Sequence, residues 1–201
     1  MKINSALAFA AATLAATTVS TAAFAHPGHT EAAGLVAGFA HPLGGLDHIL
    51  AMVGVGLFAW MLKGRALWLV PAAFVAMMAV GGVLGVFQVP VPMVELGIAL
   101  SIVVIGVLVA LGKSIPVAAA MAIVGVFAVF HGHAHGSEMP AAMSGLSYGI
   151  GFIAATALLH TIGIATGLAI GKAGEARGFQ MARAGGAAMA AIGVAIIVGV
   201  I

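Results

Sequence analysis

Six long apolar stretches, separated by short polar or Pro/Gly-containing breaks, occupy most of the chain. A transmembrane helix needs about 20 mainly apolar residues, and each stretch is close to or above this length. We therefore predict an all-α membrane protein with six transmembrane helices and no separate soluble domain. The predicted spans are residues 38–62, 66–87, 93–112, 116–135, 142–170 and 184–201.

Residues 1–25 have the pattern of a cleavable secretory signal peptide. Lys2 precedes a short apolar stretch, and the segment ends in Ala23-Phe24-Ala25, which fits an A-x-A cleavage site. An uncleaved first helix is the alternative. In either case Lys2 stays in the cytoplasm and the chain from His26 onward emerges outside, so residues 26–201 form the predicted integral membrane domain.

The basic residues give a second, independent prediction of orientation. If His26 begins outside, the loops at 63–65, 113–114 and 171–183 are cytoplasmic, and the opposite connections contain no Lys or Arg. Cytoplasmic loops are enriched in these residues, so we predict a bacterial inner-membrane protein with both mature ends outside. The basic residues after the leader are Lys63, Arg65, Lys113, Lys172, Arg177 and Arg183.

The composition supports a membrane location and excludes several kinds of chemistry. Hydrophobic residues make up 63% of the chain and charged residues only 6%, whereas soluble domains are about one quarter charged. The chain has no cysteine, which excludes disulfides, thiolate metal sites and cysteine nucleophiles. The segment Leu111-Gly112-Lys113-Ser114 lacks the first glycine of a phosphate-binding loop, because Val107 stands there. We expect neither ATP-driven transport in this chain nor a nucleic-acid partner; homo-oligomerisation is left open.

Ionisable residues inside a membrane span are costly and commonly functional. The first such group is His41-Pro42-Leu43-Gly44-Gly45-Leu46-Asp47-His48, at the outer end of the first span. We predict that His41 and His48 lie two turns apart on one helix face, with Asp47 beside them about two turns inside the membrane. The alternative is a capped helix start with interfacial histidines.

The second group follows Phe130 at the outer end of the fourth span, in the sequence His131-Gly132-His133-Ala134-His135-Gly136-Ser137-Glu138. His131, His135 and Glu138 would form one helical stripe with two imidazoles and a carboxylate. His133 would point away unless the glycines break the helix. A histidine-rich loop with incidental metal affinity is the alternative.

Four further residues are weaker metal-site candidates. Glu95 opens the third span on the outer side, where a helix dipole favours a carboxylate, so a structural role is as well supported as a ligand role. His160 lies about 27 Å along the fifth span from its start; it is either an interhelical hydrogen-bonding residue or a relay for a cation. His26 and His29 begin the exported segment, as a flexible metal-capturing arm or a passive tail.

Imidazole and carboxylate ligands without thiolate suit nickel, cobalt, zinc or ferrous ions better than cuprous ions. Neutral histidine exchanges a metal for protons near neutral pH, which would let one site load outside and empty inside. The divalent ion would be a transported substrate, and we expect no prosthetic group.

Both groups resemble signature motifs of the HupE/UreJ family of membrane proteins, which are associated with hydrogenase and urease systems. The motif H-P-x-x-G-x-D-H corresponds to residues 41–48 with the motif glycine at Gly45, and F-H-G-x-A-x-G-x-E corresponds to residues 130–138. The resemblance covers essentially the whole chain and implies secondary uptake of nickel, with cobalt in some members. The metal path that it implies involves His41, Asp47, His48, His131 and Glu138; His133, His135 and His160 rest on spacing.

A permease for Ni²⁺ or Co²⁺ that indirectly supplies the maturation of a nickel or cobalt enzyme is therefore the leading hypothesis, and the chain itself is not expected to be an enzyme. An intramembrane metalloenzyme that activates water on a bound ion is one alternative. A metal donor or scaffold that carries no ion across the membrane is another.

Overall fold

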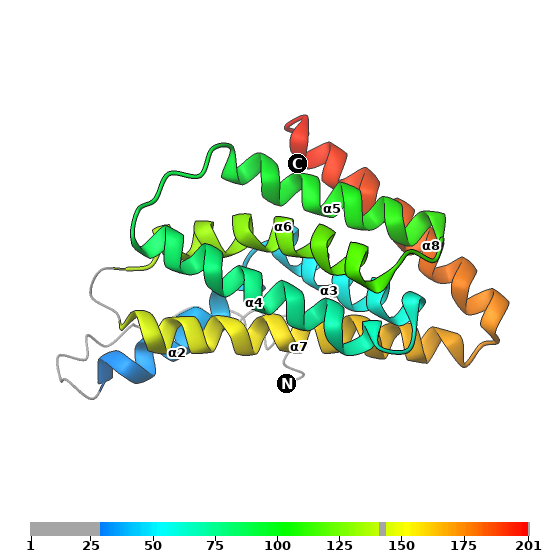
Figure 1. Cartoon of the computed structure of the whole chain (residues 1–201), viewed down its shortest axis with the longest axis horizontal. Coiled ribbons are helices and arrows are strands. Elements are labelled where there is room, and N and C mark those ends of the chain that lie inside the picture. The colour runs from blue at the N-terminus through cyan, green and yellow to red at the C-terminus, as the bar shows by residue number, and fades with distance from the viewer. Residues whose placement is uncertain (1–28, 141–143, 201) are drawn as a thin grey trace, which may run out of the picture.

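The computed structural model describes residues 29–140 and 144–200. All regular structure within these ranges is helical (Figure 1), which confirms the all-α prediction. The predicted signal peptide and His26 lie outside the described residues. The elements are α2 (His29–Ala40), the 3-10 helix η1 (His41–Leu43), α3 (Leu46–Leu62), α4 (Ala66–Val86), α5 (Val94–Leu111), α6 (Val117–Ser137), α7 (Gly145–Gly171) and α8 (Glu175–Ile197).

Five helices, α4 to α8, are long and apolar enough to cross a membrane. A sixth span is present if α2 and α3, which are joined by a sharp bend, are counted together. The second to fifth predicted spans agree with α4 to α7 to within a few residues at each end. The chain is therefore a multi-pass membrane protein.

The first predicted span is not one continuous helix. The segments on either side of the break differ in direction by 81°. Pro42 is the second residue of η1 and has no amide hydrogen with which to continue the α2 hydrogen-bond pattern. Gly45 is extended (φ −107°, ψ 125°) before α3 begins. The prediction that His41 and His48 share one helix face is wrong for this reason. Asp47 lies in the first turn of α3, not two turns inside a straight span.

The last helix begins earlier than predicted. It starts at Glu175 instead of residue 184 and includes Arg177 and Arg183, which the sequence analysis predicts in a cytoplasmic loop. Arginine and glutamate are good helix formers, and long basic side chains can reach polar groups from the end of a span. Arg183 Nε donates to the carbonyl of Ala110 at 2.7 Å, which joins the first half of α8 to the end of α5.

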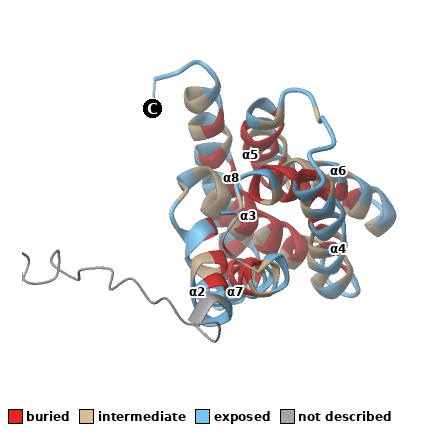
Figure 2. Cartoon of the chain, turned by 90° about the vertical axis from the view of Figure 1, so that its left-hand side faces the viewer, coloured by how far each residue is buried: buried red, intermediate tan, exposed pale blue. Residues whose placement is uncertain are grey.

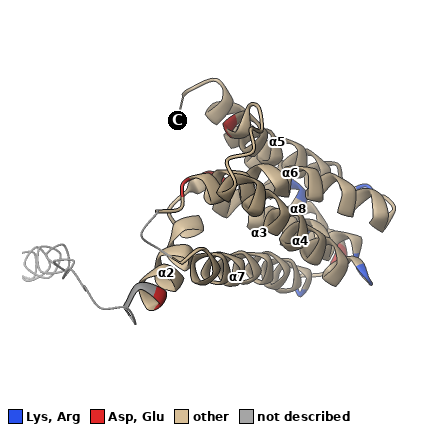
Figure 3. Ribbon diagram, turned by 60° about the vertical axis from the view of Figure 1, so that its left-hand side comes forward, with Lys and Arg blue, Asp and Glu red and all other residues tan. Residues whose placement is uncertain are grey.

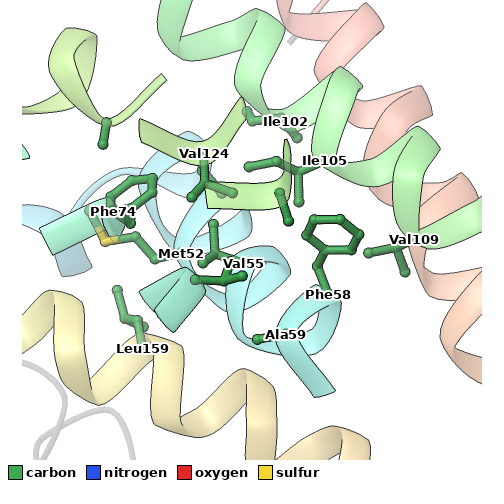
Figure 4. Packing of buried hydrophobic residues seen from close by; sticks show 14 of the residues in the cluster. Met52, Val55, Phe58, Ala59, Phe74, Ile102, Ile105, Val109, Val124 and Leu159 are labelled. Atoms are coloured by element: carbon green, nitrogen blue, oxygen red, sulfur yellow. The ribbon is translucent and has the colours of Figure 1, made fainter. Parts of the chain in front are cut away.

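The helices form a bundle around α3. α2 and α7 lie together on one side, α5 and α8 lie on the other, and α3, α4 and α6 lie between them (Figure 1). When the bundle is viewed along its long axis, the buried residues lie around α3 and on the inward sides of its neighbours (Figure 2). This core contains Met52, Val55 and Phe58 of α3 with Phe74, Ile102, Ile105, Val124 and Leu159 of the surrounding helices (Figure 4).

Glycines let α4 and α6 pack backbone to backbone. A Cβ atom at Gly132 would overlap the carbonyl of Met78, and one at Gly81 would overlap the carbonyl of Val129. Small residues permit this close approach of helices in membranes. The contact fixes the part of α6 that carries the histidine motif against α4.

Basic and acidic residues separate along the bundle (Figure 3). Lys63, Lys113 and Lys172 lie at the α3–α4, α5–α6 and α7–α8 connections, which share one end. Most acidic residues lie toward the other end (Figure 3). Glu175 is an exception. It lies at the basic end, where it accepts a hydrogen bond from Lys63 Nζ. The bundle therefore has one basic end and one end at which the two histidine motifs are found.

Candidate metal centre

Four imidazoles from the two motifs meet at the end of the bundle opposite the basic connections. The His135 ring centroid lies 4.6 Å from that of His41 and 4.5 Å from that of His48. The His48 centroid is also 5.1 Å from that of His131. We refer to His41, His48, His131 and His135 as the histidine cluster. Its members come from η1, the first turn of α3 and the last two turns of α6.

The bend between η1 and α3 makes this arrangement possible. The chain turns at Gly44 and Gly45, so that His41 and His48 approach His135 from two short elements instead of from successive turns of one helix. α6 remains helical through Gly132 and Gly136, and its i and i+4 positions therefore place His131 and His135 on one face.

Two carboxylates accompany the cluster. Asp47 Oδ1 accepts hydrogen bonds from the His48 backbone N–H and from His48 Nδ1, both at 2.8 Å. This contact orients the His48 ring and leaves Nε2 as its free nitrogen, which is the common arrangement of a metal-binding histidine held by a carboxylate. Glu138 follows the end of α6, and its Oε2 lies 3.4 Å from His41 Nε2.

Within the described residues, three side chains are already arranged much like the ligands of a metal ion. They are His41, His135 and Glu138. One possible ligand atom from each lies within 4.8 Å of the others. Bonds of about 2.0–2.2 Å to nitrogen and oxygen bring neighbouring ligand atoms to about 3–3.5 Å. Small side-chain rotations would therefore close these three residues around one ion.

Several ring nitrogens in the cluster have no hydrogen-bond partner among the described residues. They are His48 Nε2, His131 Nε2 and both nitrogens of His135. His131 Nδ1 donates to the carbonyl of Phe127 at 3.0 Å. Buried polar atoms are nearly always paired, so a set of unpaired imidazole nitrogens at one place has the chemistry of a cation site.

An open depression gives access to the cluster from the end of the bundle. Its volume is about 530 Å³, and its lining includes His41, Asp47 and His48 together with small residues of α2 and the Gly44-Gly45 break. The side of the cluster formed by His41, Asp47 and His48 therefore faces the open end of the bundle, and the unpaired ring nitrogens are buried behind it.

The structure places the remaining candidates elsewhere. His133 Nε2 donates to the Val89 carbonyl at 2.8 Å, on the side of α6 that faces the α4–α5 connection. Glu95 is exposed in the first turn of α5. His160 is buried deeper in α7. His29 is the first residue of α2, and His26 lies outside the described residues.

Aromatic residues that the sequence did not single out also contact the cluster. The Phe152 ring centroid lies 4.0 Å from that of His135, the Tyr148 centroid 6.1 Å from that of His41, and the Phe74 centroid 5.5 Å from that of His131. Single aromatic residues inside apolar spans form no distinctive pattern, so the sequence carried no signal for them.

Comparison with known proteins agrees with the motifs. A family model described as "HupE / UreJ protein" matches residues 14–196, which include both of them. The chain belongs to the HupE/UreJ family. Protein HupE of Rhizobium leguminosarum bv. viciae is 48% identical over 188 residues, which are 93% of this chain and 96% of that protein. No solved structure matches the chain.

In this HupE/UreJ family member the two motifs, although far apart in sequence, make one structural unit. The first supplies the Asp47–His48 pair and His41, and the second supplies the imidazoles and carboxylate that face them. The family model and the HupE relative confirm the resemblance inferred from the motifs, and the structure adds that the two motifs lie in direct contact.

Proposed function

We propose that the protein is a permease that carries a divalent transition-metal cation, nickel or cobalt, into the cytoplasm. The observation that carries this proposal is the histidine cluster, in which four imidazoles and two nearby carboxylates meet at one end of a multi-pass membrane protein. Membership of a family that we associate with hydrogenase and urease systems supports a nickel-related role.

The ligand chemistry supports nickel or cobalt as cargo. Nitrogen and oxygen ligands without thiolate fit these ions, and geometry and supply then decide between them. A permease must also release its ion, and protonation of imidazole weakens metal binding. A cluster near water at one end of the bundle is suited to such loading and exchange.

Charge distribution supports the direction of transport. Lys and Arg are enriched on the cytoplasmic side of membrane proteins, so we place the basic end in the cytoplasm and the histidine cluster at the outer face of the inner membrane. The start of the mature chain after residue 25 and the end of α8 then both lie outside. In this orientation the depression at the cluster opens to the outside, as uptake requires.

Nickel uptake by cells that express single-residue variants tests this proposal. His133 and His135 are buried histidines of the same helix, but only His135 belongs to the histidine cluster. His135→Gln should lower the initial uptake of labelled nickel at low concentration by about tenfold or more, because even residues that only support metal ligands act on a 10–100-fold scale. His133→Gln is the matched control, since glutamine can still donate to the Val89 carbonyl, and its uptake should stay close to that of the parent protein.

Membrane levels of both variants are measured by immunoblot. Equal uptake in the His135→Gln variant and the parent protein would contradict the proposed site. Flux into proteoliposomes then separates transport from its alternatives: a metal donor or scaffold would bind nickel without flux, and a metalloenzyme would convert a substrate without flux.

A further inference from the structure

His160 is a buried histidine whose ring forms no hydrogen bond within the part of the chain that the structure describes. Its side chain lies in the middle of α7 and is only 2% exposed. Neither ring nitrogen has a hydrogen-bond partner among residues 29–140 and 144–200. An unpaired buried polar group costs stability, so an interhelical hydrogen bond does not explain this residue, and an ionisable group of this kind within a span indicates a function.

Ring contacts connect His160 to the histidine cluster. The Phe74 ring centroid lies 5.1 Å from that of His160 and 5.5 Å from that of His131, with both pairs edge to face. Phe152, which contacts His135, is on the same helix as His160. At the helical rise per residue, His160 is about 12 Å further along α7 than Phe152. His160 is thus the next imidazole inward from the cluster, and Phe74 contacts both levels.

Two other possible metal-ligand atoms lie about one helical turn from His160, on the side of the histidine cluster. Thr156 is fully buried one turn earlier on α7, so its side chain is on the same helix face as His160. Thr156 Oγ1 donates to Met78 Sδ at 3.6 Å. Met78 is one turn after Phe74 on α4. A hydroxyl oxygen and a thioether sulfur therefore lie between the histidine cluster and the unpaired imidazole, about one helical turn from His160.

Tight packing holds this part of α7 in place. A Cβ atom at Gly56 of α3 would overlap the carbonyl of His160, and one at Gly163 would overlap the carbonyl of Val53. The backbone that carries His160 is therefore fixed against the central helix, so the position of the ring is set by the core and not by a mobile loop.

We propose that His160, with Thr156 and Met78, forms a second, inner site that receives the transported divalent transition-metal cation from the histidine cluster. This inference rests on the proposed function. One imidazole with a hydroxyl and a thioether binds such an ion more weakly than several imidazoles with carboxylates. A weak site is suited to an ion that must move on toward the basic end.

The test compares binding, stability and flux in full-length purified protein. His160→Leu removes the unpaired nitrogens, so its thermal midpoint should equal or exceed that of the parent protein. Equilibrium binding of Co²⁺ to the histidine cluster should be retained. The initial Co²⁺ flux into proteoliposomes should fall by about tenfold or more, the effect of about 1.4 kcal/mol on a barrier. His160→Gln, which keeps a polar side chain without an imidazole, should show the same loss of flux.

Thr161→Val is the matched control, because Thr161 is exposed on the next position of α7 and hydrogen-bonds only to its own helix, at Ala157. It should leave binding and flux unchanged. Flux at the parent rate in His160→Leu would overturn the inner site. So would a flux loss accompanied by an equal loss of Co²⁺ binding and of thermal stability, since this would show a structural role.

Failure of the proposed function would be visible separately, as the absence of Co²⁺ flux in the parent protein. The inner site is then tested by Co²⁺ titration of the double variant His48→Ala/His135→Ala. Weak residual binding that is lost on adding His160→Leu supports the site, and the absence of residual binding overturns it.

Discussion

Replacing Asp47 by alanine should reduce nickel uptake by about 100-fold, at the upper end of the effects seen for residues that hold metal ligands in place. Asp47 Oδ1 accepts both the ring N–H and the backbone N–H of His48. Without this carboxylate the His48 ring loses its fixed orientation, and the cluster loses a negative charge that offsets that of the cation. Asp47→Asn keeps an acceptor oxygen but not the charge, so its uptake should lie between those of the parent protein and Asp47→Ala.

Uptake of labelled nickel below saturation, corrected for protein in the membrane, measures this effect. Glu31 provides a matched control, because it is also an acidic residue in the first turn of a helix and is exposed. Glu31→Ala should transport at the parent rate. Parent-level uptake by Asp47→Ala would show that the Asp47–His48 pair has no part in transport, and an equal loss in Glu31→Ala would indicate a general charge effect.

Gly132→Ala should strongly destabilise the folded protein. The added methyl group would overlap the carbonyl of Met78 and approach the backbone nitrogen of Gly82. Overpacking commonly costs about 1–3 kcal/mol, and occasionally more; here the obstacle is backbone, which cannot rotate away. α4 and α6 would have to separate where α6 carries His131 and His135, so metal binding should be lost together with stability.

The thermal midpoint of the detergent-purified protein, followed by size-exclusion chromatography after heating, measures this loss. Gly149→Ala is the control. A Cβ atom at this position would have no atom of another helix within 4 Å among the described residues. Its midpoint should match or exceed that of the parent protein, since alanine is the better helix former. A Gly132→Ala variant as stable as Gly149→Ala would mean that α4 and α6 do not pack as closely as described.

The middle of the fold could be predicted from the sequence because its signals are direct. The segments that became α4, α5, α6 and α7 are long apolar runs bounded by Pro, Gly or Lys, and burial in lipid needs little else. The sequence predicts that the two motifs lie on the same side of the membrane, but it does not predict that they are in contact. Counting spans puts both motifs on one side of the membrane, but many arrangements of six helices would keep them apart.

The two errors at the ends have a common cause, which is that apolar content does not report where a helix starts or bends. The Gly44-Gly45 break lies inside a hydrophobic stretch, and η1 is too short to leave a periodic pattern. At the other end, Arg177 and Arg183 resemble a loop by their charge but lie on a helix that extends beyond the apolar segment. The surroundings of individual side chains could not be predicted from the sequence either. The lack of hydrogen-bond partners at His160, for example, depends on the packing of α3, α4 and α7.

X-ray absorption spectroscopy of the purified protein loaded with equimolar nickel is the most direct measurement of whether the two motifs share one ion. Nickel should be bound by nitrogen and oxygen ligands that include imidazoles from both motifs. His48→Ala and His135→Ala should therefore each lower the imidazole contribution to the spectrum. If either variant left the nickel environment unchanged, the two motifs would not form a single metal site.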